Sequence, residues 1–151
     1  MRCGSLPKRQ PAPGFPIRDD TIDQMTDKSS EAATRRTARR MAGALTVTGV
    51  IHLVRPQVYD SLIPSVLPGP ARAWSVGSGY VELAVAGLLA APATRKVGGV
   101  AAAGLFVALW PSHFKMIKDW SHKPLRKQAV AWGRLPLQIP MIRSALRVAR
   151  G

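Results

Sequence analysis

The chain has a single cysteine, Cys3, among its 151 residues. One thiol excludes an internal disulfide and a Cys-x-x-Cys relay, so a dithiol mechanism would need thiols from a partner. Histidine is also scarce, because His52, His113 and His122 are widely separated and lack the spacing of metal ligands. The chain offers no nucleophile paired with a base and no dinucleotide-binding loop. We therefore predict no metal site, no cofactor and no catalysis by this protein on its own.

Charge is nearly missing from the middle of the chain. Residues 1–40 carry 14 charged side chains and residues 115–151 carry ten, but residues 41–114 carry only six. The formal net charge of +14 raises the question of a nucleic-acid partner. A nucleic-acid binder gathers Lys and Arg on one face of a folded domain, whereas here they flank apolar segments, as they do beside anionic lipid headgroups. The charge pattern predicts a lipid bilayer as partner and no nucleic acid.

Four apolar segments follow one another, each bounded by charge or proline. A water-soluble helical bundle of this size would carry a polar stripe at helical period on every helix, and the first three segments have none. A helix that spans a bilayer needs about 20 mainly apolar residues. The sequence thus predicts an all-α polytopic membrane protein built as a bundle of four transmembrane helices. The segments are residues 41–54, 73–91, 97–114 and 128–148.

Residues 1–34 are rich in Pro, Asp, Ser and Lys and follow neither a helical nor a strand period. We expect a disordered polar tail there, followed by a membrane domain at residues 35–151. The sharp change of character near Thr34 also fits a natural start at Met25 or Met41.

Prolines divide the rest of the chain. Four of them make residues 55–70 a non-helical or short-helical link, because proline removes a backbone donor and restricts the preceding residue. Apolar side chains from Tyr59 to Leu67 give this link a side that could lie along the membrane. Pro136 and Pro140 are expected to kink the fourth segment.

The orientation follows from the positions of Lys and Arg. With the N-terminus inside, nine basic residues lie on the cytoplasmic side and seven on the outer side. Four arginines of residues 35–40 directly precede the first segment, and the first helix usually dominates the orientation. We expect a cytoplasmic N-terminus. If the fourth segment lay in the interface instead of spanning, its basic face could rest on lipid headgroups.

Glu82 is a lone acid in the uncharged run from Ala73 to Thr94. A central acidic charge costs about 2.5–3.5 kcal/mol on translocon scales, so this carboxyl should face the bundle, pair with a cation or stay protonated. Small residues share its helical face and let another helix approach closely. Two interpretations stay open, a proton-accepting or ligand-binding carboxylate and a structural ion pair. The small residues are Ser75, Ser78, Gly79, Ala86 and Ala90.

Two residues on other segments are candidate partners of Glu82. His52 lies one helical turn after Thr48, close to the end of the first segment, where a histidine often caps a helix or sits in the interface. Arg134 lies inside the fourth segment and should find an anion or extend to the surface. Our hypothesis is that Glu82 pairs with Arg134 or His52, and these three residues form the candidate intramembrane polar site.

Three stretches resemble the DoxX-like family of small bacterial four-helix membrane proteins. "GVIHLVRPQVYDSLIPSVLPGP" is similar to the end of that family's first helix and the Pro-containing link after it. "SGYVELAVAGLLAAPATRK" is similar to its small-residue second helix with a glutamate and a short turn. "LFVALWPSHFKM" matches a stretch that often reads Pro-Ala-Asn, although Ser112 and His113 take the Ala-Asn places here. The resemblance covers residues 41–148.

The resemblance implies a multi-pass protein of the bacterial inner membrane. Members of the wider family include subunits associated with quinone-linked sulfur oxidation and with oxidant defence. It therefore implies an accessory or anchoring subunit of a membrane-associated redox assembly, with an oxidoreductase as partner. The alternative is a subunit that handles quinone or protons through a buried Glu82. Relatives that act on dithiols need cysteine pairs, which this chain lacks.

Overall fold

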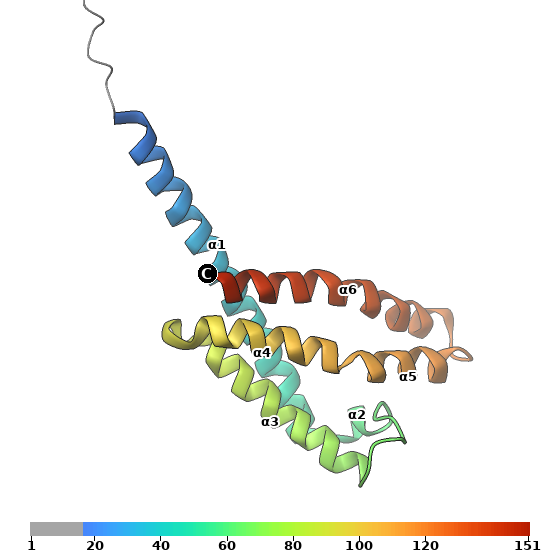
Figure 1. Ribbon diagram of the computed structural model, residues 1–151. Coiled ribbons are helices and arrows are strands. Elements are labelled where there is room, and N and C mark those ends of the chain that lie inside the picture. The colour runs from blue at the N-terminus through green and yellow to red at the C-terminus, as the bar shows by residue number, and fades with distance from the viewer. Residues whose placement is uncertain (1–16) are drawn as a thin grey trace, which may run out of the picture.

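The computed structural model describes residues 17–151, with side chains from Thr21 onward. Within that range the chain is helical without any strand, which confirms the all-α prediction (Figure 1). The helices are α1 (Ile17–Val54), α2 (Gln57–Asp60), α3 (Ala71–Ala90), α4 (Arg95–Ala108), α5 (Trp110–Trp120) and α6 (Leu125–Arg150), with a 3-10 turn η1 at Pro92–Thr94.

The helices are arranged as two packed pairs. The second half of α1 packs on α3, and α4 packs on α6, while the short turn after α3 joins the pairs (Figure 1). The helix α5 continues the course of α4 and also contacts α6. The first half of α1 projects away from the bundle, and the C-terminus lies beside the point where α1 enters it (Figure 1).

The start of α1 differs from the sequence-based expectation. Disorder was expected through Thr34, but the helix begins at Ile17, and the earlier part of the expected tail lies outside the described residues. The projecting half is exposed on every side, so tertiary packing does not hold it. Glu31 and Arg35 form an i,i+4 ion pair at 3.1 Å, a spacing that supports a solvated helix by about 0.2–0.5 kcal/mol.

Prolines affect the third and fourth segments differently. The third segment is not one helix, because α4 ends at Ala108 and Pro111 occupies the first turn of α5. A proline fits the first turn, where its missing N–H is not needed, but would clash with the carbonyl four residues earlier in a continuous helix. By contrast, α6 runs unbroken through Pro136 and Pro140. The link before α3 contains only the short α2, as predicted.

Glycines let the paired helices approach closely. A Cβ added at Gly79 would lie 2.8 Å from the Cβ of His52 and 3.0 Å from the carbonyl oxygen of Gly49. Across the other pair, a Cβ at Gly99 would lie 2.6 Å from the backbone nitrogen of Ala149. Each distance is shorter than a side chain tolerates, so both crossings require glycine. Close contact between small residues is the usual packing of helices in lipid.

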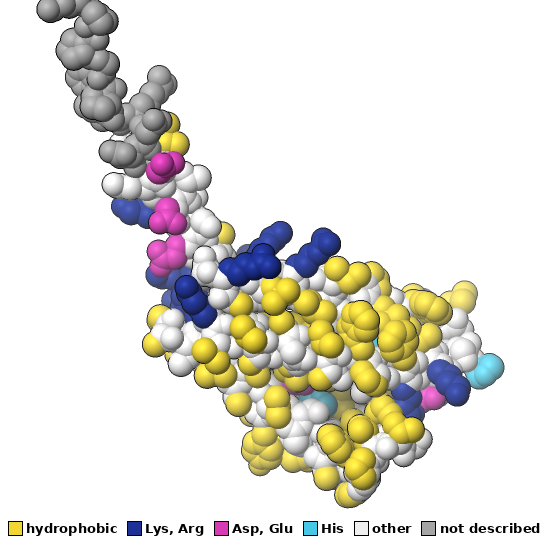
Figure 2. Space-filling model, in the orientation of Figure 1, with side chains coloured by type: hydrophobic (Ala, Val, Ile, Leu, Met, Phe, Trp, Pro, Cys, Tyr) yellow, Lys and Arg dark blue, Asp and Glu magenta, His cyan; other side chains and the backbone are white. Residues whose placement is uncertain are grey.

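The bundle has apolar outer faces. Large apolar side chains point outward along α3, α4 and α6, including Tyr80 at 64% and Val100 at 61% exposure. The core is made mostly of small residues, including Ala42, Ala86 and Ala102. Figure 2 shows hydrophobic side chains over the bundle, with basic groups along the C-terminal half of α6, beside α1 and at the α5–α6 end. Outer faces of this kind suit lipid better than water.

By length and composition, two stretches of the described chain could cross a membrane. They are Ala71–Ala90 and the continuous stretch Pro92–Trp120, which joins η1, α4 and α5. The 20 residues of α3 extend about 30 Å, the thickness of a bilayer's hydrocarbon core. The apolar part of α1 is shorter, and α6 carries arginines and prolines. The structure thus supports membrane association and leaves the four-span arrangement a prediction.

Replacing Gly79 with Ala is expected to destabilise the α1–α3 pair by about 1–3 kcal/mol, because the added methyl overlaps His52 and the backbone of α1. The matched control is Gly77→Ala on the same helix, where an added Cβ meets nothing within 4 Å. Thermal unfolding in a mild detergent compares the two. Equal melting temperatures for both variants would contradict the close crossing.

Candidate polar site

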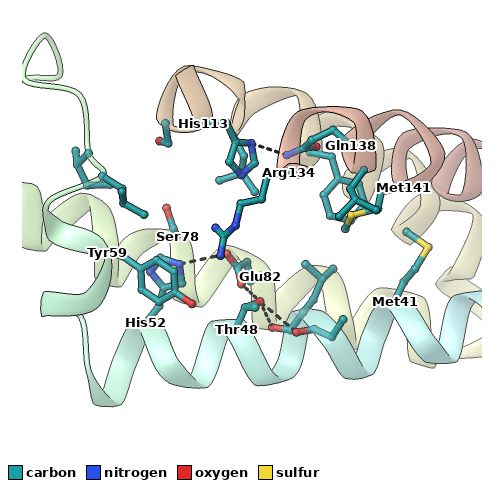
Figure 3. A pocket seen from close by; sticks show the side chains of 18 of the residues that line it. Met41, Thr48, His52, Tyr59, Ser78, Glu82, His113, Arg134, Gln138 and Met141 are labelled. Carbon is teal, nitrogen blue, oxygen red and sulfur yellow. Dashed lines mark hydrogen bonds and ion pairs between the residues drawn. The ribbon is translucent and has the colours of Figure 1, made fainter. Parts of the chain in front are cut away.

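A cavity of about 470 Å³ lies between the two helix pairs. Its walls combine apolar side chains from α1, α4 and α6 with polar groups that converge from separate helices (Figure 3). Small-molecule sites commonly have volumes of about 300–1,000 Å³ and a few oriented polar groups in an apolar lining. The polar lining residues are Arg40, Thr48, His52, Tyr59, Ser78, Glu82, Ser112, His113, Arg134 and Gln138.

Glu82 is the central group of this lining. It is 3% exposed, so its prediction as a carboxyl that faces the bundle is correct. Oε2 is hydrogen-bonded to the hydroxyl of Thr48, and Oε1 lies 3.5 Å from Nε2 of His52. Both partners come from α1, one helical turn apart. The Gly49–Gly79 crossing lies between these contacts in sequence, so the close packing of α1 on α3 brings all three side chains together.

His52 is held from three sides. Its Nδ1 lies 3.3 Å from Oγ of Ser75, which is in turn 3.2 Å from the carbonyl oxygen of Pro56. The imidazole stacks on the ring of Tyr59 with centroids 3.7 Å apart and planes 13° from parallel. With these contacts the ring is fixed, and its Nε2 is directed at Glu82 (Figure 3).

Ser75, His52 and Glu82 form a hydrogen-bonded chain that can exist in two protonation states, which differ by one proton. If Ser75 donates to Pro56, Nδ1 of His52 must donate to Ser75, and the contact between Nε2 and Oε1 then needs a proton on one of its atoms. If Ser75 donates to Nδ1 instead, Nε2 carries the ring proton and Glu82 is a carboxylate. The two arrangements differ by one proton with the heavy atoms unmoved.

The opposite wall is formed by α5 and α6. Gln138 is 4% exposed, and its Nε2 lies 2.8 Å from Nδ1 of His113. Its Oε1 has no hydrogen-bond partner within the described chain. Arg134 extends from α6 toward Glu82 without forming an ion pair among the described side chains (Figure 3). This wall therefore holds a buried acceptor without a hydrogen-bond partner beside the cavity and an unpaired cation in the cavity lining.

Tyr59 and the link around it close one end of the cavity. Burial raises the pKa of the Tyr59 phenol above its ordinary value of 10.0, the charge of Glu82 adds to the rise and Arg134 opposes it. The phenol therefore stays neutral and can donate a hydrogen bond. Asp60 pairs with Arg72 at 2.9 Å, and Lys115 of α5 donates to the carbonyl of Ser61 at 2.9 Å. These contacts fix the link against α3 and α5.

All three predicted site residues line this one cavity. His52 contacts Glu82, whereas Arg134 forms no ion pair with it, so of the two predicted pairings only that with His52 is present. On the small-residue face of Glu82, Ser75, Gly79 and Ala86 are buried, but Ala90 is exposed. In the link, Tyr59, Leu62 and Ile63 line the cavity, and Val58 and Val66 are its large exposed apolar residues.

Sequence reasoning missed the contribution of Tyr59 and His113 to the cavity. Neither residue lies in a pattern that signals a site, because Tyr59 belongs to the proline-rich link and His113 follows a helix break. Within residues 17–151, no three His, Cys, Asp or Glu side chains are grouped so that they could hold a metal ion.

Replacing His52 with Phe is expected to reduce stability by about 1–3 kcal/mol, because a phenyl ring keeps the stacking on Tyr59 but leaves Glu82 and Ser75 without their imidazole partner. His122→Phe, in the exposed turn after α5, is the control and should change stability by no more than about 0.5 kcal/mol. Thermal unfolding in detergent measures both. A His52→Phe protein as stable as the wild type would show that the buried contacts carry no free energy.

Comparison with known proteins gives one family and no named relative. No curated protein and no solved structure matches the chain. The DoxX-like resemblance thus stays a prediction. The family model described as "Domain of unknown function (DUF8561)" matches residues 41–149, a range that holds every polar residue of the cavity lining except Arg40 and leaves out the projecting half of α1. The chain belongs to this family, DUF8561.

Proposed function

We propose that this protein is a multi-pass membrane protein that holds a small molecule with an apolar body and a polar end inside its helical bundle. The observation that carries the proposal is the inverted distribution of polarity. Polar groups from α1, α3, α5 and α6 converge on an inner cavity, while large apolar side chains cover the outside. In lipid, polar side chains face the interior and mark ligand or proton pathways.

The proposal places four helical stretches in the bilayer. For α6, the length of 26 residues gives roughly 39 Å, enough to span with tilt. Its helix-breaking residues are tolerated because neighbouring helices can satisfy the freed backbone groups, and its Arg134 faces the cavity instead of lipid. The apolar part of α1 is short, but its arginines at 35, 36, 39 and 40 can extend to the headgroups.

The two ends of the bundle support an orientation in the cell inner membrane. The end with the α3–α4 turn and the C-terminus carries Arg95, Lys96, Arg143, Arg147 and Arg150 as well as the arginines of α1. The other end also holds basic residues. Counted over Lys and Arg alone, the first end has nine and the other end seven, which favours the first end, and with it the N-terminus, on the cytoplasmic side.

Binding is a better account of the cavity than catalysis by this chain alone. The described residues provide a proton-holding chain and an apolar wall, but no nucleophile activated by a base. A quinone is one molecule with an apolar body and polar ends, and a subunit that passes protons to it through Glu82 is a special case of the proposal. The oxidant and reductant would come from a partner.

A second candidate function is that of an accessory subunit that anchors a redox partner at the membrane. The observation that favours it is the first half of α1, which projects from the bundle and exposes both acidic and basic side chains. A polar helix of this kind can bridge to another protein. Mild-detergent purification from native membranes tests it, since a soluble oxidoreductase recovered in stoichiometric amount would favour anchoring, and recovery of the chain without one would oppose it.

The orientation can be tested with the single native thiol. In intact cells that express the full chain, a membrane-impermeant maleimide should label Cys3 only after the membrane is permeabilised, because the N-terminus is cytoplasmic. The control is the Cys3→Ser, Ser121→Cys double variant, whose thiol lies in the exposed turn after α5 and should react in intact cells. The reverse labelling pattern would overturn the proposed orientation.

Filling the cavity tests the proposed function. We expect a small amphiphile to co-purify with the wild-type protein in mild detergent and to be lost from Ser78→Phe, whose ring would occupy the cavity. Ala84→Phe is the matched control, because Ala84 is exposed on the same helix and should not affect retention. Native mass spectrometry measures the bound mass. Identical spectra for the two variants would mean that the cavity holds nothing.

A further inference from the structure

We infer that the cavity binds a singly charged amphiphilic oxyanion, and that binding takes up one proton at the His52–Glu82 pair. This rests on the proposed function and names its ligand class. Three parts of the site's chemistry support it, namely the excess positive charge of the cavity, the division of its lining into a polar and an apolar part, and the proton-holding contacts at Glu82.

The first part is charge. Two arginines and one carboxylate line the cavity, so positive charge exceeds negative charge even with Glu82 ionised. Arg134 is unpaired within the described chain and remains accessible from the cavity. The Arg134 side chain is exposed, and its unpaired positive charge attracts an anion, more strongly where the apolar body of a ligand displaces water from the contact. A guanidinium also presents paired donors that match the two oxygens of a carboxylate.

The second part is the shape of the lining. The hydroxyls of Tyr59, Ser78 and Ser112 line the cavity with Arg134 and can donate to an oxyanion. Apolar side chains make up most of the remaining wall, so a ligand with its oxyanion at Arg134 can bury an apolar chain against them. These side chains are Met41, Leu45, Phe106, Leu137 and Met141.

The third part is the proton. In the empty cavity, the carboxylate of Glu82 offsets the nearby charge of Arg134. An incoming oxyanion takes over that role, and the two negative charges then repel each other unless one proton from the aqueous phase joins Glu82 or His52. The contacts from Ser75 to Glu82 accept that proton with the heavy atoms unmoved.

Other charged and titratable groups line the cavity with Glu82 or lie close to His52. The lining groups are His52 and Arg40 on α1, Tyr59 on α2, His113 on α5 and Arg134 on α6, and Asp60 on α2 acts electrostatically on His52. The Tyr59 phenol stays neutral because burial raises its pKa, and a guanidinium has only donors and no atom that could take up a proton. This leaves His52, Glu82 and His113 as the groups of the lining that can take up the proton, and only the first two contact each other.

The test uses the full chain in non-ionic micelles and measures radiolabelled decanoate by equilibrium dialysis between about pH 6 and pH 8, above the ordinary carboxyl pKa of about 4. Uptake of one proton predicts an affinity that rises up to about tenfold for each unit of falling pH. Glu82→Gln mimics the protonated acid and should bind decanoate tightly with no pH dependence. Arg134→Gln should bind at least about tenfold more weakly, because the charge-assisted contacts are lost.

Two controls separate the outcomes. Arg143→Gln removes an exposed arginine of the same helix outside the cavity and should bind as the wild type does. Decanol, with the same chain and no charge, should bind more weakly than decanoate.

Equal binding of decanol and decanoate, or an unchanged affinity in Arg134→Gln, would overturn this inference but leave the proposed function intact. A pH slope that persists in Glu82→Gln would overturn the proton coupling, and failure of both ligands to bind would overturn the proposed function as well.

A membrane offers the same oxyanion chemistry from two sources, a free carboxylate and the phosphate of an anionic lipid. Decanoate binding is therefore repeated in nanodiscs of neutral lipid with and without an anionic phospholipid. Competition by the phospholipid would support the inference with a lipid headgroup as ligand. Unchanged decanoate binding would support it with a free carboxylate as ligand.

Discussion

The close approach of α1 and α3 at Gly49 and Gly79 is the constraint on which the polar site depends. A side chain at Gly79 would collide with His52 and with the backbone of α1, so the two helices can meet only because both positions lack a Cβ. At that separation Thr48 and His52 reach the two oxygens of Glu82. The buried carboxyl therefore gains partners that offset the cost of removing it from water.

The second pair of helices completes the cavity without closing it. Gly99 brings α4 against α6, and after the break at Leu109 the helix α5 carries His113 opposite Gln138. Because α1 packs mainly on α3 and α6 mainly on α4, the space between the pairs stays open. The result is a bundle with apolar outer faces, a core made mostly of small apolar residues, and an inner cavity on which polar groups converge.

The sequence predicted the helical class, the apolar segments and the inward direction of Glu82, because periodicity and the cost of a central charge determine which face is buried. Pairing between helices was less accessible, since a small-residue face does not specify its register against another helix. Gly49 was therefore missed, and the sequence did not decide between Arg134 and His52 as the partner of Glu82. The helix at residues 17–34 was also missed, because local ion pairs such as Glu31–Arg35 leave no apolar period.

The central claim is that lipid surrounds the outside of the bundle at the level of Glu82, while the polar groups face inward. The most direct test places a nitroxide spin label at Val81, which neighbours Glu82 in sequence and is 50% exposed on the outer face, in a Cys3→Ser background. Our account predicts that, in reconstituted bilayers, oxygen relaxes this label strongly and a water-soluble nickel complex does not. Strong relaxation by the nickel complex would mean that water, and not lipid, covers this face, and would contradict the account.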